Sequence, residues 1–163
     1  VDRSLSRLYH ALVWKEITPV KGTIDVPIGR HQTSRVRMSV RSHAAGREAI
    51  THYLREGTLG GGMISRVACK LETGRTHQIR VHMQHLGHPL LGDALYGLPP
   101  QEQRALLNRA GYDEDVREVV LAFPRQALHA GGIAFIHPVS GEEMAFEADL
   151  PPDFANLLEM LES

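Results

Sequence analysis

Residues 69–97 constrain the fold of this chain most, because a strand pattern, a glycine turn, a helix pattern and a second turn follow one another directly. The run 67–71 is rich in β-forming residues and stops at Thr73-Gly74. Beyond that turn, apolar side chains recur at helical spacing, at Ile79, Met83 and Leu86. Thr76 stands where an N-cap is expected, and the Gly-His-Pro run at 87–89 predicts the helix end.

The start of this predicted helix carries a cation in an unfavourable place. Arg80 falls in the first turn, where the helix dipole disfavours positive charge. Arg75 precedes the helix, and His77 and Gln78 lie at its start. A cation is stable there if an anion lies nearby, either a phosphate or a carboxylate from elsewhere in the fold. This break of a local rule indicates a functional site, with solvated arginines on a surface helix as the alternative.

Length and composition indicate one globular domain. A chain of 163 residues can bury its own core, and its 42% hydrophobic and 23% charged residues are ordinary values. No apolar run approaches the ~18 residues that span a bilayer, so no membrane partner is expected. The single cysteine, Cys69, excludes an internal disulfide and is typical of a cytoplasmic protein. Its strand context predicts a buried structural thiol.

Charge is unevenly distributed, although the formal net charge is only −1. Between Val26 and Arg47 there is no acidic residue, and there are five arginines: Arg30, Arg35, Arg37, Arg41 and Arg47. After Arg125 there is no lysine or arginine. We name residues 29–47 the basic arm. Its run 36–41 alternates apolar and polar side chains, which predicts a half-buried strand with a basic outer face.

Strand patterns dominate the remaining sequence. They cover residues 7–14, 22–28, 48–56, 126–136 and 142–148. Gly60-Gly-Gly62 predicts a hairpin loop, and residues 101–110 predict a helix within a surface excursion over 98–124. A last helix follows Pro151-Pro152, with one apolar face made of Phe154, Leu157, Leu158 and Leu161. The predicted class is α+β, with a mixed, mostly antiparallel sheet and few helices.

The ten histidines raise the hypothesis of a metal site, which their spacing does not support. Four of them are close in sequence: His77, His82, His85 and His88. No Cys, Asp or Glu completes a ligand set at the required spacing, and no His-Glu-x-x-His motif occurs, so no metal is expected. A serine hydrolase is disfavoured too, because no serine lies in a Gly-x-Ser-x-Gly turn.

Two runs resemble the signature of RluA-type RNA pseudouridine synthases: Gly74-Arg-Thr-His-Gln-Ile-Arg-Val-His-Met83, and Gly87-His-Pro-Leu-Leu-Gly-Asp93 followed by Tyr96-Gly97. The resemblance is strongest to the RluD-like branch, which acts on large-subunit ribosomal RNA. It covers nearly the whole chain, and residues 98–124 match least. It implies part of a pseudouridine synthase catalytic domain, an isomerase without a cofactor, and an RNA partner, ribosomal or transfer RNA.

The resemblance also implies roles for single residues. Arg7-Leu-Tyr9-His-Ala11 matches the family's Lys-x-Tyr-x-Ala motif with arginine for lysine, so Tyr9 would act as base or stacking platform. Arg80 ends the His-Gln-Ile-Arg motif, whose arginine pairs with the nucleophilic aspartate in the family. RNA contact is expected from arginines and one histidine: Arg30, Arg35, Arg37, Arg41, Arg75 and His77. An exposed strand kept in solution by its charge is the alternative for the basic arm.

One family motif is missing. The nucleophile lies in a His-Arg-Leu-Asp run that this sequence lacks, and Asp93 matches a family block that forms a turn. Residues 1–163 are therefore expected to be a partial catalytic domain without its N-terminal part, inactive alone and prone to self-association through open sheet edges. The alternatives are a non-catalytic RNA-binding module and a general α+β interaction domain, and an upstream His-Arg-Leu-Asp would favour the enzyme.

Overall fold

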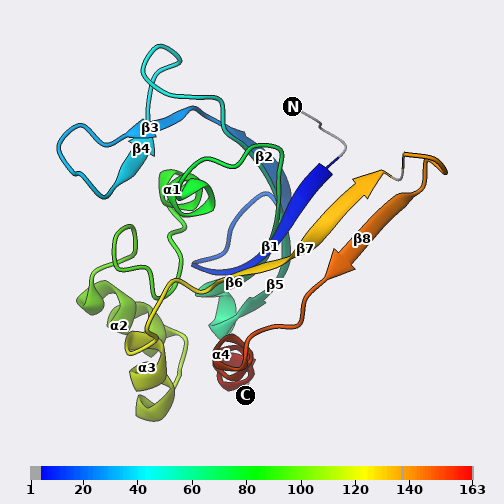
Figure 1. Cartoon of the computed structure of the whole chain (residues 1–163). Coiled ribbons are helices and arrows are strands. Elements are labelled where there is room, and N and C mark those ends of the chain that lie inside the picture. Colours follow the sequence, from blue (N-terminus) through cyan, green and yellow to red (C-terminus); the bar gives the residue numbers. More distant parts are fainter. Residues whose placement is uncertain (1–4, 137, 163) are drawn as a thin grey trace.

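The fold is built on one six-stranded sheet with the strand order β2-β5-β6-β1-β7-β8 (Figure 1). The computed structural model describes residues 5–136 and 138–162. The strands are β1 (Leu5–Trp14), β2 (Lys21–Asp25), β5 (Ile50–Leu59), β6 (Ile64–Leu71), β7 (Leu128–Ile136) and β8 (Glu143–Glu147). All pairings between these strands are antiparallel. The α+β class with a mostly antiparallel sheet is therefore confirmed.

A short hairpin and four helices surround this sheet. The hairpin pairs β3 (Ile28–Arg30) with β4 (Met38–Val40) and belongs to the basic arm. The helices are α1 (Gln78–His85), α2 (Pro100–Arg109), α3 (Glu114–Leu121) and α4 (Pro152–Glu162). Figure 1 shows α1 beside the hairpin at one end of the molecule, and α2, α3 and α4 together at the other end. None of the helices in the described ranges is long and apolar enough to cross a membrane.

Strand β1 lies inside the sheet and joins two hydrophobic clusters. Its side chains alternate between the sheet faces, as the pleat requires. Ala11 and Val13 pack in one cluster with Ile79 of α1. Leu12 and Trp14 pack in the other cluster, which contains residues of the other three helices. All of these β1 side chains are fully buried, so β1 ties α1 to the rest of the core.

Several sequence predictions are confirmed by the packing. Gly60-Gly-Gly62 forms a short 3₁₀ turn between the antiparallel strands β5 and β6. Helix α4 buries its predicted apolar face, which consists of Phe154, Leu157, Leu158 and Leu161. Cys69 is a buried free thiol, and burial raises its pKa to about 12, with the charge of Glu56 adding to the effect. At that pKa the thiol stays protonated, as expected of a structural cysteine.

The predicted strand 36–41 is wrong at both ends. Only Met38–Val40 is strand, and Val36 is 64% exposed rather than turned inward. The Ser34 side chain accepts hydrogen bonds from the backbone N–H groups of Val36 and Arg37. This turn holds the chain away from a ladder geometry until Met38, because serine oxygens compete with strand pairing.

The predictions for α1 and for residues 98–124 also need correction. Thr76 is exposed and does not cap α1, which begins after His77, and Leu86 is 38% exposed at its end. Residues 98–124 contain a second helix, α3, capped by Asp113, whose side chain accepts a hydrogen bond from the N–H of Val116. Three residues of this region belong to the core: Leu106, Leu107 and Val120. The region is thus part of the packed domain rather than a surface excursion.

Candidate active site

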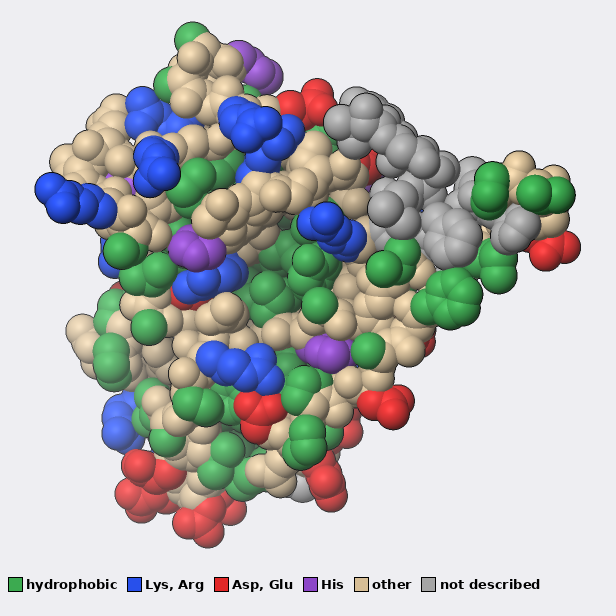
Figure 2. Space-filling model, viewed as in Figure 1, with side chains coloured by type: hydrophobic (Ala, Val, Ile, Leu, Met, Phe, Trp, Pro, Cys, Tyr) green, Lys and Arg blue, Asp and Glu red, His purple; other side chains and the backbone are tan. Residues whose placement is uncertain are grey.

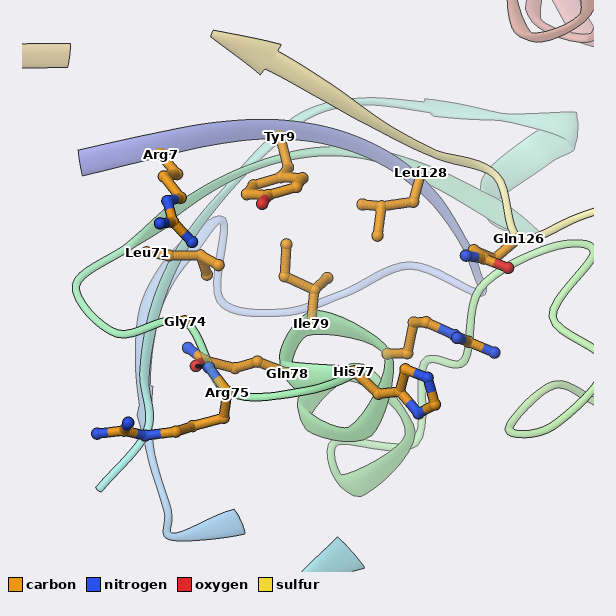
Figure 3. Close-up of a pocket in the computed structure, with 11 residues that line it drawn as sticks. Arg7, Tyr9, Leu71, Gly74, Arg75, His77, Gln78, Ile79, Gln126 and Leu128 are labelled. Carbon is orange, nitrogen blue, oxygen red and sulfur yellow. Dashed lines mark hydrogen bonds between the residues drawn. The ribbon is translucent and has the colours of Figure 1, made fainter. Parts of the chain in front are cut away.

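A cavity of about 240 Å³ lies between the start of α1 and strands β1 and β7 (Figure 3). Its lining comes from β1, from the end of β6, from the loop and first turn of α1, and from the start of β7 with the chain before it. The lining residues are Arg7, Tyr9, Leu71, Gly74, Arg75, His77, Gln78, Ile79, Arg80, Gln126 and Leu128. In Figure 3, Tyr9 and Leu128 point toward Ile79, which points back at them from α1. The volume is below the ~300 Å³ of the smallest drug-sized sites, so the cavity suits one small ring.

Tyr9 lies beside an irregularity in the pairing of β1 with β7. Leu8 pairs with Gly132 and Tyr9 with Ala130, so Gly131 is an extra residue in β7 at this step. Such a bulge twists the strand and re-aims the side chain beside it. A Cβ on residue 131 would come within 2.6 Å of the His10 ring, so a larger residue there would force that ring to move. The bulge thereby places the Tyr9 ring against the cavity.

Helix α1 is held on the sheet by a buried polar network. Gln78 donates to the carbonyl of Ile50 and to the hydroxyl of Thr51. Its carbonyl oxygen accepts from the Thr73 hydroxyl and from the Arg75 N–H. Both donors and both lone pairs of the amide are used, so the buried amide leaves no polar group without a hydrogen-bond partner. The network fixes the loop ahead of α1, and with it the cavity floor.

His82 completes this network from the next turn of α1. It has no exposed surface. Its Nε2–H donates to the Val26 carbonyl at 3.0 Å, and Nδ1 accepts from the Thr51 hydroxyl at 2.8 Å. Burial lowers its pKa below the usual 6.5, and the Val26 carbonyl offsets part of the shift. The imidazole is therefore neutral, with each nitrogen committed to one partner.

We expect the depressed pKa of His82 to make the fold sensitive to mild acid. Between its folded-state pKa and the usual 6.5, the unfolded chain binds a proton that the folded chain does not. His82 thus contributes full stability above pH 6.5 and progressively less below it. Urea unfolding from pH 8 to pH 5 should show this loss. His82→Gln should be less stable overall but have a flatter profile below pH 6.5, and equal slopes in both proteins would contradict the assignment.

Arg80 forms a two-point ion pair with Asp93. Its Nε and Nη2 lie 2.8 Å from Oδ2 and Oδ1 of Asp93. The Asp93 side chain is fully buried and that of Arg80 is 11% exposed. The carboxylate also accepts the backbone N–H groups of Leu95 and Tyr96, which closes the turn after Gly92. A carboxylate from elsewhere in the fold thus balances the positive charge of Arg80 in the first turn. This is one of the two kinds of anion considered from the sequence.

The ion pair shifts both partners toward their charged forms. Burial opposes ionisation of Asp93, but the hydrogen bonds from Arg80 and from the Tyr96 N–H prevail and hold its pKa below 3.8. The hydrogen bond to Asp93 raises the pKa of Arg80. Asp93 uses two of the five N–H donors of the guanidinium, and Arg80 is among the residues that line the cavity. The partner seen here, Asp93, differs from the nucleophilic aspartate that the family resemblance implies.

The residues predicted to contact RNA separate into two groups. Arg75 and His77 line the cavity, although in Figure 3 the Arg75 side chain extends away from it, and Arg75 Nε donates to the Glu48 carbonyl. The others lie on the basic arm. Arg30, Arg35 and Arg37 are exposed. Arg41 is half-buried and donates to the Arg30 carbonyl, so it supports the hairpin.

The two ends of the molecule carry opposite charge. Figure 2 shows Lys and Arg side chains gathered over β3 and β4, and Asp and Glu side chains gathered at the end formed by the helices. The view also shows a hollow floored by hydrophobic side chains between these ends. Among the residues that the structure describes, no three His, Cys, Asp or Glu side chains are placed to hold a metal ion. His77 and His88 instead bond Tyr96 and the Trp14 carbonyl.

Sequence reasoning gave no site role to several residues that the structure brings to the site. Gln126 and Leu128 line the cavity and Tyr96 contacts Arg80, whose guanidinium carbon lies 5.0 Å from the centre of its ring. Tyr96 lies in a run that resembles the family signature, and the resemblance extends over Gln126 and Leu128, so the resemblance contained the signal. Periodicity alone did not identify them, because the pattern around Leu128 is that of an ordinary strand and the pattern around Tyr96 is that of a turn.

Comparison with known proteins places this geometry in a family. A family model described as RNA pseudouridylate synthase matches residues 1–85. The ribosomal large subunit pseudouridine synthase D of Zymomonas mobilis is 41% identical over 160 residues, which is 98% of this chain and 46% of the relative. That of Vibrio vulnificus is 46% identical over 164 residues, with the same two shares. The chain thus spans about half the length of these curated relatives.

Solved structures show the same fold. Human RNA Pseudouridylate Synthase Domain Containing 1 superposes with a TM-score of 0.63 at 28% identity, over 99% of this chain and 60% of its own. Human RNA Pseudouridylate Synthase Domain Containing 4 superposes with a TM-score of 0.68 over 98% of this chain and 63% of its own. The second structure is 23% identical, so it supports the shared fold and nothing further.

Proposed function

Because the chain belongs to the RNA pseudouridylate synthase family, we propose that it is the uridine-binding part of a pseudouridine synthase that modifies large-subunit ribosomal RNA in the cytoplasm. The observation that carries this proposal is one cavity lined by Tyr9, Ile79, Leu128 and Arg80. The first three provide an apolar slot for a flat base that has left its stack, and Arg80 provides a cationic edge. Relatives named as ribosomal large subunit pseudouridine synthases support the substrate class.

The reaction needs a nucleophile, a base and an orienting cation, and no cofactor. The bond between uracil N1 and C1′ of the ribose breaks, the base turns, and C5 bonds to C1′. C5 then loses its hydrogen as a proton and N1 takes up a proton, so that the product is an isomer of the substrate. We propose that Tyr9, which lines the cavity, takes that proton or stacks on the base. None of the described residues that line the cavity is Asp or Glu. We therefore propose that the nucleophilic carboxylate comes from outside residues 1–163 and is held by the remaining donors of Arg80.

The test is release of tritium from RNA labelled at uracil C5. The 163-residue chain is run beside a version extended upstream to include a His-Arg-Leu-Asp run. Activity in the extended protein alone is expected. Turnover by the 163-residue chain would refute the missing nucleophile, and RNA binding without turnover in either protein would favour a non-catalytic RNA-binding module.

The basic arm provides the proposed phosphate contacts. Arg35 and Arg37 are exposed, and Tyr96 anchors the arm through the N–H of Met38. Each lost phosphate contact should lower the slope of log K against log salt by about 0.7–0.9. We expect this from Arg35→Ala and Arg37→Ala in RNA binding titrations. Arg109→Ala, an exposed arginine of α2, is the matched control, and an equal effect there would point to net charge alone.

We also propose self-association through the β8 edge. Strands β2 and β8 are the two outer strands of the sheet. Beside the edge, Ile133 and Phe146 form a cross-strand pair and are 46% and 59% exposed. Unpaired edges with apolar neighbours favour pairing with a second copy. Sedimentation should show a concentration-dependent dimer that Phe146→Lys abolishes, whereas a monomer at all concentrations would contradict the proposal.

A further inference from the structure

The hydroxyl of Tyr96 lies between the basic arm and the cavity. It accepts the backbone N–H of Met38, in β4, at 2.8 Å. It lies 2.7 Å from Nδ1 of His77, the residue that precedes α1. The two rings meet edge to face, with centres 5.5 Å apart and planes at 73°. One buried side chain therefore joins the arm, the start of α1 and, through its ring, Arg80.

The hydrogen bonds of Tyr96 determine the protonation of His77. Tyr96 is 2% exposed, so its hydroxyl proton has no access to solvent and needs an acceptor. The Met38 N–H is a donor, which leaves His77 Nδ1 as that acceptor. An imidazole that accepts at Nδ1 is neutral and carries its proton on Nε2. A charged His77 would offer a second N–H to the oxygen and leave the tyrosine proton unbonded.

Two other observations single out His77. Its backbone is left-handed, with φ 56° and ψ 25°, a conformation that histidine adopts more readily than most residues but which remains uncommon. Strain of this kind gathers at functional sites. Burial lowers its pKa, the charge of Arg80 lowers it further, and Asp93 offsets part of the shift. The ring thus stays neutral at the mouth of a cavity that Arg7 and Arg75 also line.

We propose that Tyr96 is a positioning residue that holds His77 as its Nε2–H tautomer, so that His77 donates a hydrogen bond to an RNA phosphate beside the bound uridine. The inference rests on the proposed function. A phosphate is the favoured acceptor because Arg7 and Arg80 also line the cavity, and neutral His77 adds direction without adding charge. The hydrogen bond between Tyr96 and the Met38 N–H fixes the position of this donor relative to the arginines of the basic arm.

The tautomer is tested by long-range ¹H–¹⁵N spectra of the 163-residue chain labelled with ¹⁵N-histidine. The unchanged chain should show His77 with a proton on Nε2 alone. Tyr96→Phe keeps the ring but lacks the hydroxyl, and should give a mixture of tautomers at His77 without changing the spectrum of His85, an exposed histidine of α1. A proton on Nδ1 in the unchanged chain, or an unaltered His77 in Tyr96→Phe, would overturn the assignment.

The RNA contact is tested with a fluorescent RNA hairpin that has a uridine-rich loop. His77→Gly suits the left-handed backbone but has no donor, and should weaken binding by about tenfold or more. Because it also removes the acceptor of the buried Tyr96 hydroxyl, its binding is measured well below the Tm of the variant. His77→Asn also tolerates this backbone and keeps an amide donor, so it should bind more tightly than His77→Gly. Equal binding by His77→Gly and the unchanged chain would overturn the contact. Failure of the unchanged chain to bind would overturn the proposed function instead, and the contact with it, while the tautomer result would stand.

Discussion

Replacing Asp93 by asparagine is expected to lower the free energy of unfolding by about 3–5 kcal/mol, because it leaves a nearly buried guanidinium without its counter-ion. The asparagine side chain has the same shape, but it turns an N–H₂ group toward one of the two Arg80 donors that now meet carboxylate oxygens. Chemical denaturation measures the loss directly. For a domain of this size the Tm should fall by roughly 6–20 °C.

A second ion pair in the same chain provides the matched control for Asp93. Arg125 and Asp153 also form two N–H···O contacts, at 3.2 and 2.9 Å. Their side chains are 36% and 42% exposed, so solvent screens the pair. Asp153→Asn should therefore destabilise the protein far less than Asp93→Asn. Similar losses in both variants would show that burial does not determine the value of the Arg80–Asp93 pair.

Removing the hydroxyl of Tyr9 is expected to lower kcat of the extended protein by about 10²–10⁴-fold, the usual contribution of a positioned base. Tyr9→Phe keeps the ring that faces Ile79 across the cavity, so RNA binding should change little. Tyr9→Leu removes the stacking surface too, and should weaken RNA binding by about 1–3 kcal/mol. The measurements are single-turnover tritium release and RNA titration.

The same pair of variants separates the two roles left open for Tyr9. Full activity in Tyr9→Phe, together with impaired activity in Tyr9→Leu, would make the residue a stacking platform and move the base elsewhere. Tyr112→Phe is the control, because the Tyr112 hydroxyl donates to the Leu161 carbonyl in the helical end of the molecule. It should affect stability without a specific effect on turnover.

Sequence patterns predicted those parts of the fold that are determined by residues within a single element. The apolar repeat of α4 and the strand patterns correspond to elements that bury the same residues, because amphipathic periodicity is set along one element. The prediction failed where a side chain changed the backbone. Ser34 bonds the N–H groups of Val36 and Arg37 and shortens β4, and His77 rather than Thr76 precedes α1 in a left-handed conformation.

For the candidate site, the sequence by itself predicted an anion beside Arg80, with solvated arginines as the alternative, and the family resemblance implied catalytic roles for Tyr9 and Arg80. Only the tertiary structure decided which anion that is, since Asp93 meets Arg80 across 13 residues of chain. It also decided that Leu128 closes the cavity and that Tyr96 joins the basic arm to His77. These contacts join segments that are distant in sequence. The periodicity within one segment cannot predict which side chain of a distant segment will contact that segment.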